Sequence, residues 1–427
     1  MDHIDSYYAR TATPRAPFAA LSGPEEADVC IVGGGLAGVS TALELVRRGR
    51  RVALVEANRI GWGASGRNGG FVGIGFAQDM NGILRKAGPE RAARLWALSV
   101  EGMEAVKANI AELGLTDAQP VPGVMWMARY DNLAGYSAYR DALARTIGFE
   151  TEVLDRDAIR NMLVTDAYFC GVLDRRSFHM HPLNYINGLA LAVQGLGGRL
   201  FEESRATSVA REGAGWRVGT AGGSVLAREV VLCGGGYTDS LVPALKRAYL
   251  PIATYVVVTE AAPERLAEAI RTPVALGDDR RASDYYRLIE GGQRLLWGGR
   301  ITARTAEPAR LAELLRADMV SVYPQLDGIK VETAWSGLMS YATHFMPQVG
   351  ALEPGLWHAT AFGGHGLNTT AAAGRVLAEA MCGESERIKD FAPFGLDWAG
   401  GPLGPLAVQM VYWTYQALDA WRERGTR

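Results

Sequence analysis

The sequence predicts an α/β protein of two interleaved domains, one built on a parallel sheet covered by helices and the other on an antiparallel sheet. Three observations support this fold class. A strand–helix–strand pattern of about 30 residues begins near residue 28. Two further apolar strands run into glycine turns, at 229–236 and 355–362. Between them, residues 250–300 are strand-rich and contain a hairpin-type turn at 290–293.

Apolar periodicity and glycine or proline punctuation place the individual elements. Residues 1–27 are polar and interrupted by prolines, so we expect an arm outside the core. Helices are expected at 36–48, 89–114, 182–197, 309–323 and 367–381. Strands are expected at 28–33, 51–56, 252–259, 285–289 and 294–299, with a run of alternating strands over 198–231.

The composition is that of a globular protein without a strongly charged surface. Hydrophobic residues make up 48% and charged residues 21% of the chain, and the formal net charge is −2. This balance gives no reason to expect a nucleic-acid partner. The four cysteines are far apart, which argues against a disulfide framework. Because no stretch reaches the ~20 apolar residues of a transmembrane helix and the first residues lack an apolar signal core, we expect a cytoplasmic protein.

A glycine array lies between the first predicted strand and helix. Gly33, Gly35 and Gly38 form G-x-G-x-x-G, in which the glycines permit a tight turn, close approach to a pyrophosphate, and close packing of helix on strand. The helix N-terminus favours phosphate. Glu56 ends the next strand and can accept hydrogen bonds from ribose hydroxyls. The fingerprint predicts a Rossmann-like domain that binds FAD or NAD, and Glu56 alone does not decide between the two cofactors.

The length of the chain predicts two domains. Residues 1–85, 160–245 and 335–427 are assigned to a discontinuous dinucleotide-binding domain, and 86–159 and 246–334 to a substrate domain on the antiparallel sheet. A last helix, expected at 402–422, carries large apolar residues. It either packs on the chain's own surface or contacts a partner. These apolar residues are Val411, Trp413 and Trp421.

Several short motifs carry a family resemblance. Residues 59–70 (Arg-Ile-Gly-Trp-Gly-Ala-Ser-Gly-Arg-Asn-Gly-Gly) follow Glu56 almost directly, and residues 362–366 read Phe-Gly-Gly-His-Gly. Further motifs are Ser-Tyr-Tyr at 6–8, Asp-Tyr-Tyr-Arg at 284–287 and Trp-Gly-Gly-Arg at 297–300. Together they resemble the D-amino-acid-oxidase-like superfamily of FAD-dependent amine and amino-acid oxidoreductases, and are most similar to its gamma-glutamylputrescine oxidoreductase branch. The resemblance extends to about residue 382.

This resemblance implies that FAD lies along the glycine motifs. Val209 matches the strand whose backbone meets the adenine, and the helix that opens at 363–369 is expected to point its N-terminus at the flavin, where reduced flavin carries negative charge. The expected cofactor-binding residues are Gly33, Gly35, Leu36, Ala37, Gly38, Glu56, Ala57, Gly63, Ala64, Ser65, Arg67, Asn68, Gly69, Gly70, Val209, Cys233, Gly234, Gly235, Gly364, His365, Gly366, Leu367, Asn368 and Thr369. Relatives that tether FAD use a Cys in the region matching 335–340 or a His in the first glycine loop. Neither is present here, so we expect non-covalent FAD.

The resemblance further implies hydride transfer to flavin N5 from the carbon next to an amine nitrogen, giving an imine that hydrolyses to an aldehyde or keto acid. Candidate substrate-binding residues are Tyr255, Tyr286, Arg287 and Trp297, and candidate catalytic residues are His365, Tyr286, Arg287 and His344. Aromatic rings suit an amine, and an Arg suits a substrate carboxylate. Because strand residues alternate, only one of Tyr285 and Tyr286 can face the site.

The resemblance leaves the electron acceptor open. Relatives carry an oxygen-promoting Lys where residues 295–298 read Leu-Leu-Trp-Gly, so oxygen and another acceptor both stay possible, with an oxidase favoured. A flavin hydroxylase is an alternative, although its late Gly-Asp motif is replaced by 362–366. A non-catalytic FAD-stabilised subunit is another alternative. His179 and His181 form an H-x-H pattern without a third ligand nearby, so no metal is expected.

Overall fold

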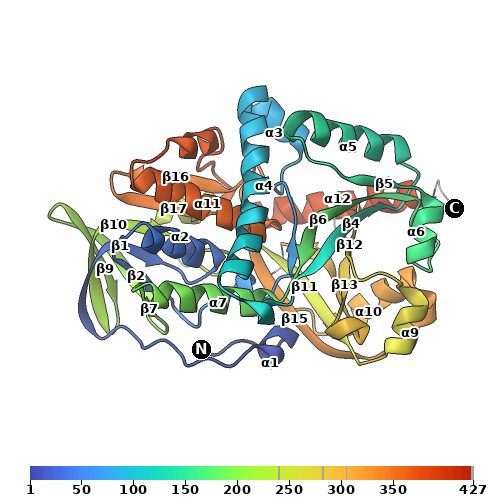
Figure 1. Ribbon diagram of the computed structural model, residues 1–427, viewed down its shortest axis with the longest axis horizontal. Helices are drawn as coiled ribbons and strands as arrows, with labels where there is room; N and C mark the ends of the chain where they lie inside the picture. The colour runs from blue at the N-terminus through green and yellow to red at the C-terminus, as the bar shows by residue number, and fades with distance from the viewer. Residues whose placement is uncertain (239–240, 281–282, 304, 425–427) are drawn as a thin grey trace.

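Two β-sheets organise the chain (Figure 1). The computed structural model describes residues 1–238, 241–280, 283–303 and 305–424. Within them, an eight-stranded sheet has the order β16-β17-β10-β1-β2-β7, with β8 and β9 attached through β10. A nine-stranded sheet has the order β15-β11-β14-β13-β12-β4-β6-β3, with β5 attached to β6. Figure 1 shows the first sheet on the left and the second on the right.

The centre of the first sheet is parallel. Its parallel strands are β1 (Gly23–Val32), β2 (Val52–Val55), β7 (Arg199–Phe201), β10 (Gly223–Leu232) and β17 (Leu356–Thr360). Val32 lies beside both Val55 and Leu232, and Leu232 lies beside His358. The carboxyl ends of β1, β10 and β17 therefore meet at one edge, and a glycine-rich turn follows each of them. At the margins, β16 (Gln348–Glu353), β8 (Ala206–Glu212) and β9 (Gly215–Thr220) add antiparallel pairs.

The second sheet is antiparallel except where β12 runs parallel to β4. Its strands are β3 (Phe71–Val72), β4 (Val121–Ala128), β5 (Glu152–Leu154), β6 (Cys170–His179), β11 (Leu250–Thr259), β12 (Ala275–Asp278), β13 (Tyr285–Ile289), β14 (Arg294–Thr302) and β15 (Val331–Tyr341). One face packs into a hydrophobic core that includes Met125, Leu173 and Tyr286. The opposite face is therefore available to line a site.

Four helices cover the parallel sheet and its junction with the second one: α2 (Leu36–Arg47), α4 (Pro89–Glu112), α7 (Pro182–Gly195) and α11 (Gly366–Met381). Glycines let α11 approach its neighbours closely. A Cβ on Gly374 would lie 2.8 Å from Thr41 N on α2, and one on Gly102 of α4 would lie 2.2 Å from Asn368 O on α11. The remaining helices are α1 (Tyr7–Thr11), α3 (Met80–Ala87), α5 (Leu133–Ile147), α6 (Arg156–Met162), α8 (Pro243–Lys246), α9 (Pro263–Ala269), α10 (Leu311–Val322) and α12 (Gly404–Arg424).

The N-terminal segment differs from the expected arm. Ser6 accepts a hydrogen bond from Ala9 N–H and begins helix α1, and the ring of Tyr8 is fully buried. Tyr8 packs edge-on against Trp335 and His181, so burial of aromatic surface fixes this segment on the domain.

Sheet membership also differs from the expected domain ranges. Strands β6 and β15 belong to the second sheet, although 160–245 and 335–427 had been assigned to the dinucleotide-binding domain. Helix α12 likewise packs against β14 of the second sheet, where Thr302 donates a hydrogen bond of 2.7 Å to Gln409.

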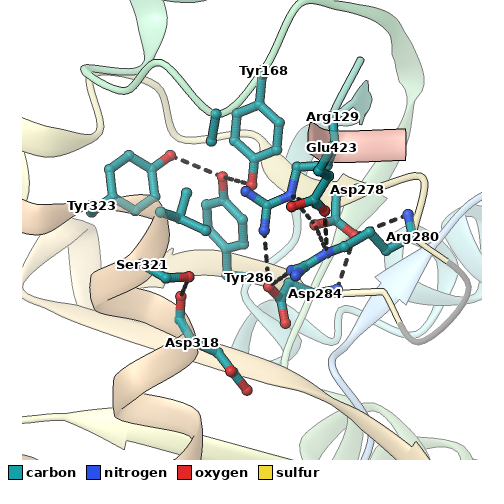
Figure 2. A network of polar contacts seen from close by, with 12 residues as sticks. Arg129, Tyr168, Asp278, Arg280, Asp284, Tyr286, Asp318, Ser321, Tyr323 and Glu423 are labelled. Atoms are coloured by element: carbon teal, nitrogen blue, oxygen red, sulfur yellow. Dashed lines mark hydrogen bonds and ion pairs between the residues drawn. The ribbon is translucent and has the colours of Figure 1, made fainter. Parts of the chain in front are cut away.

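A buried polar network fixes the far face of the second sheet (Figure 2). Arg129 and Arg280 both pair with Asp278, at 3.2 and 2.9 Å, and Arg280 also pairs with Asp284. Glu423 of α12 lies 3.8 Å from Arg129 and ties the end of that helix to the network. Beside this network, the Tyr286 hydroxyl forms hydrogen bonds with those of Tyr168 and Tyr323, at 3.0 and 2.8 Å.

Candidate functional site

A cavity of about 750 Å3 lies between the carboxyl edge of the parallel sheet and the open face of the second sheet. This volume is in the range of cofactor and ligand pockets. Four glycine-rich segments line it, within 33–37, 63–69, 233–237 and 363–367. The turns that follow β1, β10 and β17 therefore converge on one site.

The first glycine turn has no room for side chains. Gly33 has a φ of +112°, and a Cβ there would lie 2.9 Å from Cys233 O. A Cβ on Gly38 would lie 1.9 Å from Gly33 O, so only glycine lets α2 start this close to β1. Leu36 N–H donates to Ser65 Oγ at 2.9 Å, which joins the first turn to the second glycine loop. The N-terminus of α2 opens on the cavity and favours an anion there.

Glu56 is held in place at the end of β2. Its two carboxylate oxygens accept hydrogen bonds from Gly34 N–H at 2.6 Å and Asn58 N–H at 2.9 Å. Burial raises the pKa of this carboxyl, and the two N–H groups oppose that rise. Nearby, Arg205 and Ala206 line the cavity. Val209 of β8 does not line it, because that strand leaves the site after Ala206.

The second glycine loop holds a buried cation. The Arg67 guanidinium lies between the rings of Trp62 and Tyr237, 4.3 and 5.1 Å from their centroids. Its Nε donates to Trp62 O at 2.8 Å and its Nη1 to Tyr237 OH at 3.1 Å. Asn68 braces the loop by donating to Ala64 O and Ser65 O. Gly70 does not line the cavity, since it packs under Met180 O.

The first turn of α11 forms the opposite end of this part of the cavity. Gly366, Leu367 and Asn368 line it, whereas Thr369 points away and bonds His365 O. His365 itself lines the cavity, and burial lowers its pKa to about 4, so the imidazole is neutral at pH 7. The positive end of the α11 dipole therefore faces the same space as that of α2.

These residues fit FAD. Arg67 Nη2 and His365 Nδ1 are buried and have no hydrogen-bond partner among the described residues, although both side chains line the cavity. Unsatisfied buried polar atoms are rare, and a bound ligand explains them. With its pyrophosphate at the α2 N-terminus and its ring system near α11, FAD would give each nitrogen a partner in a space that the glycines keep clear.

The cavity continues beyond the glycine turns into an aromatic chamber on the second sheet. Tyr285, Phe71 and Trp126 line it, with ring centroids 5.8 Å apart for Phe71–Tyr285 and 6.5 Å for Phe71–Trp126. The Tyr285 hydroxyl lies 3.3 Å from Thr254 Oγ1. Tyr341 and Phe362 line the cavity next to α11. The site thus joins a dinucleotide-sized groove to an apolar chamber that can hold a small organic molecule.

The family follows from comparison with known proteins. A family model described as FAD dependent oxidoreductase matches residues 28–380. The chain belongs to this family. It is 35% identical to gamma-glutamylputrescine oxidoreductase of Escherichia coli over 394 residues, 92% of each chain. It is 30% identical over 436 residues to a probable oxidoreductase, OrdL, of Haemophilus influenzae, covering 99% of this chain and 98% of that one.

Solved structures show the same fold. Glycine oxidase from Geobacillus kaustophilus superposes with a TM-score of 0.74 at 22% identity, covering 87% of this chain and 99% of that chain. L-amino acid deaminase from Proteus vulgaris gives a TM-score of 0.74 at 18% identity, with 89% and 99% covered. The comparisons confirm the resemblance, the α/β fold with a Rossmann-like FAD-binding domain, and FAD as the cofactor of this FAD dependent oxidoreductase.

The candidate substrate residues do not gather in this oxidoreductase's cavity. Tyr286 and Trp297 stack at 4.2 Å in the core behind the second sheet, and Tyr255 lies in the same core. Strand alternation turns Tyr285, not Tyr286, toward the cavity. Gly298 is the residue in the sequence that could have indicated this choice. It lies opposite Tyr285 on the neighbouring strand, and because it has no side chain it leaves room for the Tyr285 ring.

Arg287 and His344 have structural positions outside the cavity. Arg287 donates to Gly69 O at 2.8 Å, Met180 O at 2.9 Å and Tyr8 OH at 3.1 Å, so it fastens the second glycine loop to the N-terminal segment. His344 uses Nε2 on Gly395 O and Nδ1 on Met346 N–H. Neither side chain lines the cavity, because each is held by hydrogen bonds to groups behind the lining.

The H-x-H pattern is also committed to hydrogen bonds. His179 contacts Pro273 O at 2.9 Å and Arg287 at 3.0 Å, and His181 Nδ1 accepts from Asn184 N–H at 3.1 Å to cap α7. Among the residues that the structure describes, no group of three or more potential ligands is arranged for a metal ion. No described helix is both long enough and apolar enough to cross a membrane.

Gly38→Ala should abolish tight flavin binding. Its Cβ would meet Gly33 O and push α2 away from the glycine turn. We expect the apparent Kd for FAD to rise at least about tenfold, because the displaced helix N-terminus would lose a hydrogen bond to the charged pyrophosphate. The Kd is measured by titrating apoprotein with FAD and following flavin fluorescence. Gly195→Ala is the control, because nothing lies within 4 Å of a Cβ there. Equal flavin affinity in both variants would contradict the assignment.

His181 should make folding acid-sensitive. Burial, aided by the Arg287 charge, lowers its pKa from 6.5 to about 4, so the unfolded chain binds its proton at a higher pH than the folded one. The neutral His181 side chain therefore makes its full contribution to the free energy of unfolding above about pH 6.5. This contribution is lost as the pH falls toward 4. His181→Asn keeps an N-cap residue for α7. In urea unfolding, the stability lost between about pH 7 and pH 5 should be about 2 kcal/mol smaller in this variant. If wild type and His181→Asn lost the same stability over this pH range, the expectation would be contradicted.

Proposed function

We propose that this chain oxidises the carbon–nitrogen bond of a small amine or amino acid, giving an imine that hydrolyses to an aldehyde or keto acid. The observation that carries the proposal is the continuity of the cofactor groove with the aromatic chamber of Phe71, Trp126 and Tyr285. Gamma-glutamylputrescine oxidoreductase and glycine oxidase, two of the similar proteins, are named for substrates with such a bond.

Each part of the site has a chemical task. Bound FAD would supply a two-electron acceptor, at flavin N5, for the hydride of the carbon next to nitrogen. The free N–H groups at the start of α11 stabilise negative charge that develops beside Gly366 and Leu367. His365 stays neutral above about pH 4 and offers a hydrogen bond rather than a charge. The aromatic walls exclude water and bind the substrate's carbon chain, and Thr254 orients Tyr285.

Oxygen is the acceptor that we propose, and glycine oxidase among the similar structures supports it. A dehydrogenase that uses another acceptor is the second candidate. It is favoured by strand β14, where residues 295–298 contain no Lys and Trp297 is turned into the core.

Anaerobic reduction of the holoenzyme tests the function. The holoenzyme is mixed without oxygen with a panel of amines and amino acids. Only compounds of the substrate class should reduce the flavin and bleach its visible absorption bands. Readmitting air should restore the colour and release hydrogen peroxide from an oxidase, whereas a dehydrogenase should recolour only with an added dye. Bleaching by NADPH in the presence of an aromatic substrate, with no response to any amine, would instead indicate a hydroxylase.

We also propose that FAD is bound without a covalent link. The Cys233 thiol at the cavity edge is buried, and residues 335–340 contain no Cys. Acid precipitation of the yellow holoenzyme should therefore leave all of the flavin in the supernatant. Flavin that stays with the pellet would show a covalent link, and its loss in Cys233→Ala or His365→Ala would locate the attachment.

A further inference from the structure

The aromatic chamber extends along β4 and β6 to a buried carboxylate. Val124 and Trp126 of β4 lie directly opposite Asp174 and Val172 of β6. Cross-strand partners share a face of the sheet, and all four side chains line the cavity. The intervening residues of both strands point into the core behind the sheet. Strand alternation thus fixes Asp174 on the cavity side.

The wall opposite Asp174 has polar atoms of its own. Tyr139 and Leu143 of α5, and Thr151 after it, line the cavity. Thr151 Oγ1 is buried and has no hydrogen-bond partner among the described residues. Tyr139 is 38% exposed; its partial burial and the negative charge of Asp174 raise its pKa, so the phenol keeps its proton near that carboxylate. This end of the chamber can therefore surround a polar group.

Hydrogen bonds hold Asp174 rigidly. Burial raises the pKa of its carboxyl, whereas those hydrogen bonds and the charge of Arg176 oppose the rise. Its Oδ1 accepts hydrogen bonds from the backbone N–H groups of Arg176 and Ser177, at 2.9 and 3.0 Å, and Ser177 Oγ donates to its Oδ2. The residue is 8% exposed and forms no ion pair with a residue that the structure describes. The Arg176 guanidinium pairs instead with Glu104, at 2.8 Å. A buried carboxylate without a cation is costly unless a ligand supplies one.

The rest of this end contains no positive charge to bind an anionic substrate. Its described lining residues are Val124, Trp126, Tyr139, Leu143, Thr151, Val172 and Ser177, and none is basic. Lining residues with basic side chains lie instead at the glycine turns and the groove, where they are Arg67, Arg205, Lys246 and His365. The face of Trp126 also favours a cation over an anion.

We propose that the substrate is an amine that carries a second, positively charged nitrogen at its far end, and that Asp174 binds this distal ammonium. The inference rests on the proposed function, because it takes the chamber as the place where the amine lies. Asp174 would thus select diamines and their conjugates over chains that end in a methyl group or a carboxylate, while the reacting end stays next to α11.

Matched substrates and one isosteric variant test the proposal. The substrates are 1,4-diaminobutane, n-butylamine and 4-aminobutanoate, with their six-carbon counterparts, which share a reacting end and differ in the distal group. Asp174→Asn keeps an oxygen for the two backbone N–H groups and removes the charge. Asp155→Asn is the control, because Asp155 accepts from Ala158 N–H in the same way, is exposed, and does not line the cavity.

Wild-type kcat/KM should fall in the order diamine, monoamine, ω-amino acid. Asp174→Asn should lower kcat/KM for the diamine about ten- to hundredfold, mainly through KM, as expected for a lost charge-assisted hydrogen bond. It should change the monoamine by less than about twofold and improve the ω-amino acid. Thermal unfolding and flavin content should match those of Asp155→Asn.

The outcomes separate the two proposals. If no amine bleaches the wild-type flavin, the proposed function fails. If amines are oxidised but Asp174→Asn lowers all three substrates equally, the distal-ammonium inference is overturned and the function stands. Should Asp174→Asn fail to fold, the wild-type order decides, because a preference for the ω-amino acid over the diamine is incompatible with a carboxylate at that end.

Discussion

The site depends on the register of three parallel strands. Because β1, β10 and β17 end together, the turn after β1 and the turn after β17 deliver the N-termini of α2 and α11 to one cavity. Two helix dipoles then point into one cavity, where they would act on the phosphates and on the ring of one bound dinucleotide. The close contacts that require Gly33, Gly38 and Gly374 are the steric condition for this arrangement.

The second sheet contributes through its two faces. One face carries the stacked rings of Tyr286 and Trp297 and the buried ion pairs of Figure 2. These contacts make that side of the sheet rigid. The other face presents Tyr285, Trp126 and Asp174 to the cavity. A rigid backing lets these side chains keep fixed positions, so the chamber can discriminate between ligands by charge and length.

Local patterns in the sequence predicted most of the residues that line the cofactor groove, although Gly70, Val209 and Thr369 lie outside it. The glycine array, the strand that precedes it and the helix that follows are specified by neighbouring residues, as are α11 and its glycine turn. Choices that depend on tertiary packing were not available. Tyr285 and Tyr286 have the same local pattern, and only the cross-strand glycine, Gly298, decides which ring faces the cavity. Arg287 carries the same charge whether it binds a substrate or the backbone of a loop.

Other differences have the same origin. The N-terminal segment is polar on average, yet Tyr7 and Tyr8 bury it, because two aromatic rings outweigh the exposed residues around them. Val209 and Ala206 lie in one strand, and the point at which that strand leaves the cavity is set by its pairing with β9. Asp174 gave no signal in the sequence, since a lone carboxylate in a strand is noticed only when its surroundings are seen.

The arrangement of two helix N-termini around one dinucleotide is tested most directly by a crystal structure of the FAD-loaded protein. The account predicts the pyrophosphate over Gly33–Leu36 and the isoalloxazine between the first turn of α11 and Tyr285. Density that places the ring away from α11, or the phosphates away from α2, would contradict it.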